Sequence, residues 1–287
     1  MADSDSQPLI RHISDTARLA AMYRALESEH PDALFRDPFA RRLAGIRGEQ
    51  ILDATPKRSR HEWAWVTRTY LFDRFITQQI QQGVDLVVNL AAGLDARPYR
   101  MPLPQALQWV EIDLPKLIAW KQEMLAGETP VCRLERIGLD LADVEARRRV
   151  FDQLGRRGTR ALIVTEGILI YLSSEEVASL AQDLARPPAF QRWALDLSSP
   201  VLLRMIQKDQ LGQQMDRVAS PMKFGPPEGP AFFQPHGWRA VDVQALLKAG
   251  AQVKRVSLFM RLLAKLPDTE RSRRSRPWGG VCLMERA

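Results

Sequence analysis

The chain has 287 residues, of which 45% are hydrophobic and 26% charged, and its formal net charge is +7. This composition is ordinary for a soluble globular protein, and the length can bury a sizeable core. The basic clusters lack interleaved aromatic residues, which argues against a nucleic-acid-binding surface, and no apolar run approaches the roughly 20 residues that span a bilayer. We therefore expect a cytoplasmic protein with neither nucleic acid nor membrane as a partner.

The two cysteines, Cys132 and Cys282, are spaced like neither metal ligands nor a redox pair. This spacing predicts no disulfide framework and no metal site. We expect both thiols to be buried in strands, in a reducing compartment.

Helical periodicity dominates the first 82 residues. Apolar positions predict helices over 14–26, 39–43 and 63–81, the last of them long and amphipathic. No strand pattern precedes residue 85, so we expect a helical cover over 1–82, placed before the sheet in chain order.

From residue 85 onward, short apolar runs alternate with helical segments, which is typical of a mostly parallel sheet with crossover helices. The predicted strands are 85–90, 108–112, 132–138, 161–165, 193–197, 253–259 and 281–285. The predicted helices are 114–125, 143–154, 174–184 and 241–249, with a capping box at Ser173 and Glu176 and a stop at Gly250. We expect one α/β domain over 1–287, in which 83–287 form a seven-stranded sheet with helices on both faces.

The connection from 200 to 237, between the fifth and sixth strands, breaks this alternation. It is rich in proline, glycine, methionine and phenylalanine. Long irregular connections are commonly lids or substrate walls, and the aromatic residues favour a packed lid insertion over a disordered one.

The first strand ends in Ala91, Ala92 and Gly93, which leave little side-chain bulk. Ligands of parallel sheets bind where strands end, so a cofactor could contact the backbone here; a plain strand-to-helix turn is the alternative. The second strand is followed by Asp113, an acid that can bind the ribose hydroxyls of a nucleoside or cap the next helix.

Acids also follow the third and fourth strands. Asp140 can accept the exocyclic amine of an adenine while Leu141 packs on the ring, although Asp140 can equally cap a helix. Glu166 lies in an apolar segment and therefore needs a cationic partner. Arg68, on the long helix before the sheet, can bind a ligand carboxylate or form a surface ion pair.

These positions together favour a ligand that has an adenosine, a cation and a carboxylate. S-adenosylmethionine has all three. A dinucleotide needs a Gly-x-Gly-x-x-Gly turn for its pyrophosphate, whereas the sequence AAGLDAR has a single glycine. A nicotinamide dehydrogenase is therefore the weaker interpretation, and a Walker loop is absent as well.

Longer motifs run in one order across most of the chain: TARLAAMYRALES, RDPFARRLAG, TRTYLFD, NLAAGLDARPYR, VEIDLPKLIAWK, GLDL, TEGILIYL and a late GW at Gly237 and Trp238. In this order and spacing they resemble the leucine carboxyl methyltransferase superfamily, in particular its bacterial O-methyltransferase branch, often associated with polyketide metabolism. The resemblance implies a class I methyltransferase (Rossmann-like) sheet whose last strand inserts antiparallel.

By the same resemblance, six residues bind S-adenosylmethionine and its product S-adenosylhomocysteine: Arg68, Gly93, Asp113, Asp140, Leu141 and Glu166. The family also uses a basic residue of the first helix, a role that either Arg18 or Arg24 can take here. Asp95 and Arg97 are expected to brace the turn and not to touch the methyl group.

The implied reaction is methyl transfer to a carboxylate or hydroxyl of a small organic acceptor, such as a polyketide-like metabolite. A carboxylate is ionised at neutral pH and needs no base. A hydroxyl would use one, and among His12, His30, His61 and His236 we favour His236 because it lies in the predicted lid. Two alternatives stay open: methylation of a protein C-terminal carboxylate, and a regulator that binds the cofactor without turnover.

Overall fold

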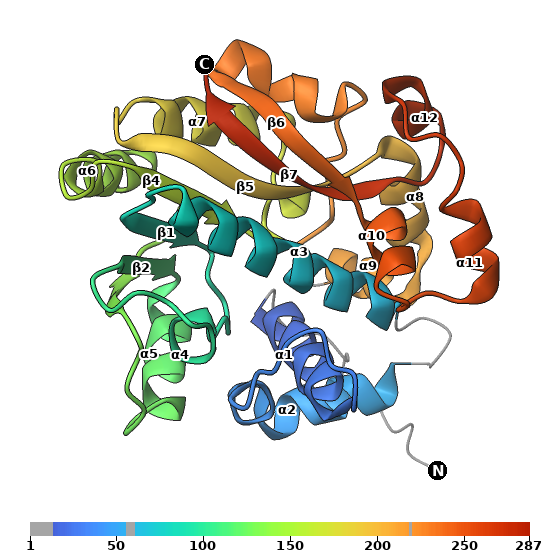
Figure 1. Ribbon diagram of the computed structural model, residues 1–287, viewed down its shortest axis with the longest axis horizontal. Helices are drawn as coiled ribbons and strands as arrows, with labels where there is room; N and C mark the ends of the chain where they lie inside the picture. Colours follow the sequence, from blue (N-terminus) through green and yellow to red (C-terminus); the bar gives the residue numbers. More distant parts are fainter. Residues whose placement is uncertain (1–13, 56–60, 218–219) are drawn as a thin grey trace.

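The strands of the computed structural model form one seven-stranded sheet in the order β3-β2-β1-β4-β5-β7-β6 (Figure 1). The structure describes residues 14–55, 61–217 and 220–287. Neighbours from β3 to β5 run parallel, whereas β7 runs antiparallel to both β5 and β6. The strands are β1 (Leu86–Leu90), β2 (Gln108–Asp113), β3 (Arg133–Gly138), β4 (Ala161–Thr165), β5 (Phe190–Ser198), β6 (Trp238–Ala245) and β7 (Gly279–Arg286). The predicted sheet, with its last strand inserted antiparallel, is confirmed.

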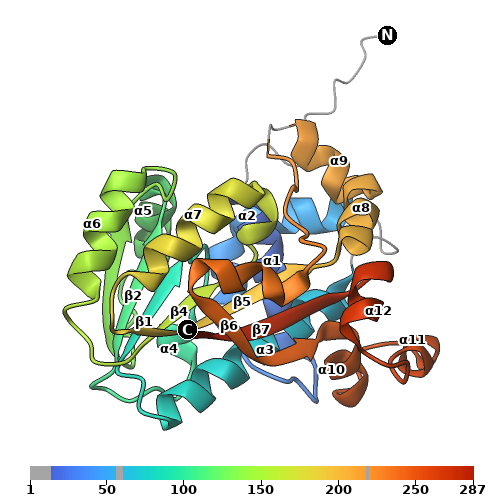
Figure 2. The same ribbon diagram turned by 90° about the horizontal axis from the view of Figure 1, so that it is seen from above.

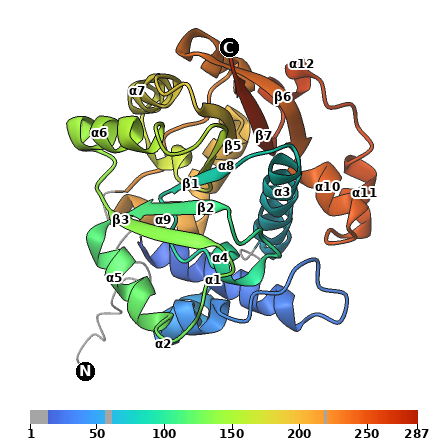
Figure 3. The ribbon, with the colours of Figure 1, turned by 60° about the vertical axis from the view of Figure 1, so that its left-hand side comes forward.

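The two central strands, β1 and β4, are buried along their whole length. Because alternate strand residues face opposite sides of a sheet, both sides need apolar cover. Val88 belongs to the core under α6 (Val144–Leu154) and α7 (Ser174–Ala185), and Val87 to the core under α3 (Glu62–Gln81) and α10 (Leu246–Gln252). Figure 3 shows α6 and α7 on one side of the sheet and α3 on the other.

Helices α1 (Ser14–Glu29) and α2 (Ala40–Ala54) cover neither face of the sheet. They pack with Leu94 and Ala96, from the turn after β1, and with Leu117 of α5 (Pro115–Met124). They therefore lie over the carboxyl ends of the strands, below the sheet in Figure 1. The helical segment before the sheet thus divides: α1 and α2 form a cover, and α3 belongs to a sheet layer.

The sixth strand is where the sequence prediction is wrong. The predicted strand 253–259 is a turn followed by α11 (Leu258–Leu263), whose first turn is capped by Ser257. The predicted helix 241–249 is instead the second half of β6 followed by α10, so Gly250 lies inside a helix and does not end it. A register shift between Ala240 and Asp242 interrupts the period-two pattern of β6, and the strand forms because β7 supplies its hydrogen-bond partners.

Over the described residues 200–217 and 220–237 the connection is largely helical and not irregular, in contrast to the prediction. It contains α8 (Pro200–Lys208), α9 (Gln210–Arg217) and a 3-10 helix, η3 (Gly229–His236). Phe224 and Phe233 belong to the core beneath α7, where Phe233 packs edge-on against Trp193 of β5. These aromatic side chains stabilise the sheet layer, which leaves α8 and α9 as the part that can act as a lid.

Both cysteines are buried and free. Cys282 lies in β7 as predicted, whereas Cys132 lies one residue before β3. Burial raises the pKa of the Cys132 thiol to about 11, so this thiol is protonated at neutral pH. Within the described ranges, the chain has no helix with the length and apolar character of a membrane span.

Candidate active site

A cavity of about 1540 Å³ opens at the carboxyl ends of the strands. Its walls come from α1, α3, the turns after β1 to β5, α8, α9 and the segment from α10 to β7. The six residues predicted to bind the cofactor all line it: Arg68, Gly93, Asp113, Asp140, Leu141 and Glu166. Residues that lie up to 98 positions apart in the chain therefore face one space, which is the arrangement expected of a ligand site in a parallel sheet.

The turn after β1 has a strained backbone. Ala91 has φ +49° and Gly93 φ +53°, and a residue with a side chain is uncommon in this left-handed region. A Cβ at Gly93 would stand 3.4 Å from the Cβ of Ala17 on α1. Glycine thus gives this turn both its conformation and a bare backbone facing the cavity.

Asp113, the last residue of β2, is tied to the same turn. Its Oδ2 accepts a hydrogen bond from the Gly93 N–H at 2.6 Å, and its Oδ1 accepts from the Leu114 N–H at 2.7 Å. Burial raises the pKa of Asp113 above the ordinary aspartate value. Since a carboxylate has about four acceptor positions, two protein donors leave room for two ligand hydroxyls.

Asp95 and Arg97 brace the turn, as predicted. Asp95 accepts hydrogen bonds from the side-chain amide of Asn89 at 2.8 Å and from the Arg97 backbone N–H at 2.9 Å. Burial alone would raise the pKa of Asp95, but the nearby cations Arg97, Lys121, Arg100 and Arg24 together outweigh it, so the pKa is held well below the usual range. The turn is therefore fixed by a buried ionic network before any ligand binds.

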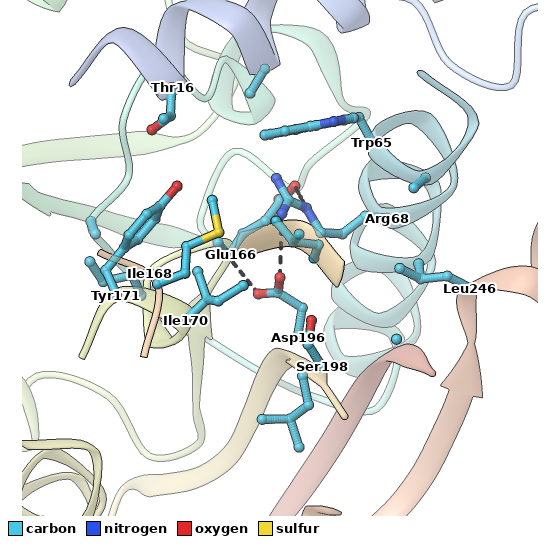
Figure 4. A pocket seen from close by; sticks show the side chains of 18 of the residues that line it. Thr16, Trp65, Arg68, Glu166, Ile168, Ile170, Tyr171, Asp196, Ser198 and Leu246 are labelled. Carbon is cyan, nitrogen blue, oxygen red and sulfur yellow. Dashed lines mark hydrogen bonds and ion pairs between the residues drawn. The ribbon is translucent and has the colours of Figure 1, made fainter. Parts of the chain in front are cut away.

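Arg68 lies between two acids (Figure 4). Its Nε donates to Glu166 Oε1 at 3.2 Å and its Nη1 to Asp196 Oδ2 at 3.3 Å, and its guanidinium stacks 4.8 Å from the ring centre of Trp65. Among the described residues, Nη2 has no hydrogen-bond partner. The cationic partner that Glu166 needs is thus supplied by the protein, by Arg68 and also by Arg97 at 2.8 Å.

Two further residues of this cluster, Asp196 and Tyr171, were not predicted from the sequence to belong to the site. Asp196, near the end of β5, accepts from the Gly167 N–H at 2.7 Å as well as from Arg68. Burial raises the pKa of both Asp196 and Tyr171, so the Tyr171 phenol remains protonated at neutral pH. The acid at the end of the fifth strand in ALDLSS was the available signal for Asp196.

Asp140 and Leu141 lie at the end of β3, on the rim of the cavity. Asp140 Oδ1 accepts from the Ala142 N–H at 2.9 Å, and the Leu141 carbonyl accepts from Arg147 Nη1 at 3.0 Å. These bonds hold the backbone of the rim. Asp140 is exposed and Leu141 partly buried, so both side chains are accessible to a ligand.

Of the two candidate basic residues on α1, only Arg24 lines the cavity. It donates to the Leu94 carbonyl at 2.6 Å and to Asp37 at 2.8 Å. Arg18 donates to the Ala44 carbonyl at 2.8 Å and stacks over Trp120, away from the cavity lining. The geometry therefore favours Arg24 for a ligand contact.

The structure does not bring His236 to the cavity. At the end of η3, it lies 3.3 Å from Gln182 of α7 and packs against Phe232. His61, at the start of α3, does line the cavity, and its Nε2 lies 3.4 Å from Asp209 Oδ2. His30 is outside the lining as well, and His12 lies outside the described residues.

We expect His236→Ala to transfer methyl groups at the wild-type rate, because the imidazole contacts α7 and not the cavity. Rates would be compared by counting label from methyl-labelled S-adenosylmethionine in the acceptor fraction of cell extract. The same assay on His61→Ala tests the histidine that does line the cavity. A large loss of rate in His236→Ala, in a variant that unfolds like the wild type, would contradict the expectation.

The sheet order, the antiparallel seventh strand and the cavity at the strand ends define a class I, Rossmann-like methyltransferase fold. Two solved structures share it over nearly the whole chain. A DUF574 family protein from Streptomyces avermitilis has a TM-score of 0.59 at 13% identity, covering 95% of this chain and 97% of its own. A methyltransferase-like protein of Thermobifida fusca has a TM-score of 0.55 at 15% identity, with 99% of each chain covered. At these identities the likeness concerns the fold alone.

The model of the leucine carboxyl methyltransferase family matches residues 17–185. A protein of Parafrankia sp. (strain EAN1pec) named "Putative S-adenosyl-L-methionine-dependent methyltransferase" is 32% identical over 246 residues, which cover 81% of this chain and 79% of the relative. A protein of Streptomyces coelicolor with the same kind of name is 33% identical over 239 residues, covering 78% and 82%. The chain belongs to the leucine carboxyl methyltransferase family, which confirms the predicted family and enzyme class.

Proposed function

We propose that this methyltransferase transfers the methyl group of S-adenosylmethionine to an oxygen, a carboxylate or a hydroxyl, of a small organic acceptor. The donor follows from the family: the chain is an S-adenosylmethionine-dependent methyltransferase, like the relatives reported above. The oxygen acceptor and its small size are the proposed part. They rest on the lining of the cavity.

The near half of the cavity fits the donor, residue by residue. Arg68 Nη2 suits the methionine carboxylate, and Glu166 suits its ammonium group. The bare backbone at Gly93 allows the methionine part to come close. Asp113 would hold the ribose hydroxyls, and Asp140 with Leu141 would flank the adenine. The turn after β1 has a single glycine, which does not match the glycine-rich turn that a pyrophosphate needs.

The far half of the cavity carries the acceptor proposal. It is walled by apolar side chains from α8, the segment after α9 and the last 42 residues: Leu202, Met205, Ile206, Met222, Leu246, Leu263, Leu266 and Trp278. The whole cavity, about 1540 Å³, exceeds the roughly 300–1,000 Å³ of an ordinary small-molecule pocket. A donor and a largely apolar organic acceptor therefore fit together.

When bound, S-adenosylmethionine supplies an electrophilic methyl group that the acceptor oxygen can attack in line. The chain's own contribution is alignment and exclusion of water: Arg68 and Asp113 fix the donor, and α1, α8 and α9 cover the strand ends. A carboxylate acceptor needs no base. For a hydroxyl acceptor, His61 beside Asp209 is a histidine in the cavity lining that could serve as the base.

The test is methyl transfer from labelled S-adenosylmethionine into cell extract, followed by separation of protein from small molecules. We expect the label in an organic-soluble small molecule. Treatment with mild base then tells a methyl ester, which it cleaves, from a methyl ether, which it leaves intact. Arg68→Met, which should bind the donor poorly, serves as the control for label that does not depend on the cofactor site. Label confined to protein C-termini would overturn the proposal in favour of protein carboxyl methylation. Donor binding with no labelled product in any fraction would indicate a regulator without turnover.

A further inference from the structure

Helix α11 carries an apolar stripe that faces solvent. Together with Leu266, which follows three residues after the end of the helix, its exposed apolar side chains form what we call the α11 stripe: Leu258, Phe259, Leu262, Leu263 and Leu266. Leu258 is 80% exposed, Phe259 68% and Leu262 63%. The positions repeat at the spacing of one helical face, which in a surface helix normally packs on the core. Of the nine large apolar side chains that are exposed in the described ranges, five belong to this stripe.

The helix is well formed although its apolar face has no cover. The Ser257 hydroxyl accepts from the Met260 N–H at 3.4 Å at the start of the helix, and Arg261 Nε donates to the Val256 carbonyl at 3.2 Å. Figures 1 and 2 both show α11 at the outer edge of the molecule, beyond α10. The α11 stripe therefore lies on a projecting part of the molecule.

Basic residues flank the stripe along the chain. The segment 252–277 contains eight basic and two acidic residues, in a chain whose net charge is +7. Arg255 pairs with Glu27 at 2.8 Å, and Arg273 pairs with Asp268 at 2.9 Å. Four exposed cations of the segment have no acidic partner among the described side chains: Lys254, Lys265, Arg274 and Arg276.

The stripe also adjoins the cavity. Leu263 and Leu266 line the cavity and are at the same time 39% and 44% exposed to solvent, and Met260 of the same helix is a lining residue too. The apolar wall of the acceptor half thus continues outward onto the α11 stripe. A ligand leaving the cavity on this side would meet an apolar surface before it met water.

We propose that the α11 stripe docks on an anionic lipid bilayer. A projecting helix that combines exposed Leu and Phe with neighbouring Lys and Arg matches the physical profile of an interfacial helix, whose apolar face enters the headgroup region while its cations meet anionic lipids. A protein partner would have to supply a complementary groove, whereas a bilayer accepts a projecting apolar stripe directly. The contact is a surface contact and needs no membrane-spanning helix.

Docking in this orientation brings the exposed part of the cavity wall, at Leu263 and Leu266, to the lipid surface. Resting on the proposed function, we infer that the acceptor is a lipophilic molecule that enters the cavity from the bilayer. Exposed apolar patches of this kind otherwise favour aggregation, so a lipid partner also accounts for why the stripe is left open.

The test is cosedimentation with vesicles, in the absence of donor and acceptor. We expect binding to vesicles of equimolar phosphatidylglycerol and phosphatidylcholine, much weaker binding to phosphatidylcholine alone, and loss of binding with added salt. Two double variants should each lower the partition of the protein onto the anionic vesicles by roughly tenfold or more. One combines Leu258→Glu with Phe259→Glu, and the other combines Lys265→Glu with Arg274→Glu. The matched control is Ile46→Glu, since Ile46 is an isolated side chain on α2, 75% exposed, and this change should leave binding unaltered.

Three results would overturn the docking. One is no binding to anionic vesicles; another is binding that the stripe variants do not change. The third is a concentration-dependent dimer in analytical ultracentrifugation that Leu258→Glu dissolves, which would assign the stripe to a second copy of the chain. Vesicle binding needs no turnover, so a protein that binds vesicles but methylates nothing would refute the proposed function and leave the docking intact.

Discussion

Arg68→Met is expected to weaken S-adenosylhomocysteine binding by roughly ten- to a hundredfold, because the variant loses the charged donor proposed for the ligand carboxylate. It should also lower the free energy of unfolding by about 3 kcal/mol at neutral pH, because Glu166 and Asp196 lose a shared buried cation. This figure is at the lower end of the usual range since Arg97 still pairs with Glu166. Calorimetric titration and urea unfolding measure the two effects separately.

The stability loss should depend on pH in a definite direction. Burial already raises the pKa of Asp196, and removal of Arg68 raises it further. An acid whose folded pKa lies above its unfolded pKa costs stability in full at pH above the folded value; the cost shrinks as the pH falls below that value and vanishes below the unfolded pKa. The difference between wild type and Arg68→Met should therefore shrink on acidification.

Two comparison variants separate ligand binding from folding. Arg68→Met with Asp196→Asn should recover part of the stability and none of the affinity. Arg255→Met removes a comparable cation from buried Glu27, and neither residue belongs to the cavity lining, so this variant should lose stability and keep its affinity. If Arg255→Met binds S-adenosylhomocysteine as poorly as Arg68→Met, the affinity loss reflects misfolding and not a missing contact.

Asp113→Ala is expected to weaken S-adenosylhomocysteine binding by about 1–3 kcal/mol, because the ribose hydroxyls lose their proposed acceptor. The Gly93 N–H loses its partner at 2.6 Å in the same variant, so part of the loss comes from a less ordered turn. Asp113→Asn keeps one acceptor oxygen and should fall between wild type and Asp113→Ala. Titration calorimetry at constant pH gives all three values.

The matched control for this series is Asp143→Ala. Asp143 lies in the turn after β3 and caps α6, with its Oδ1 accepting from the Ala146 N–H at 2.9 Å, but it is not part of the cavity lining. The variant should lose about 1 kcal/mol of stability as a missing cap and no affinity. Unchanged binding by Asp113→Ala would remove the ribose role from this residue.

Much of the sheet could be predicted from the sequence because local patterns are sufficient there. The strands β1 and β4 are buried on both faces, so their apolar runs are continuous, and the capping box at Ser173 and Glu176 is local by nature. The strand β6 could not be predicted, because a register shift interrupts its alternation and its hydrogen-bond partners lie in β7, about 40 residues later. Hydrogen bonds between distant segments leave no local signal.

The sequence by itself determined the family, the acids and small residues at the strand ends, and hence six of the residues that line the cavity. The tertiary structure decided what those residues contact: Arg68 lies between Glu166 and Asp196, His236 faces α7 while His61 faces the cavity, and the apolar face of α11 remains exposed. The reason is physical. Strand ends follow from local periodicity, whereas ion pairs, orientation and exposure depend on segments that meet only when the chain has folded.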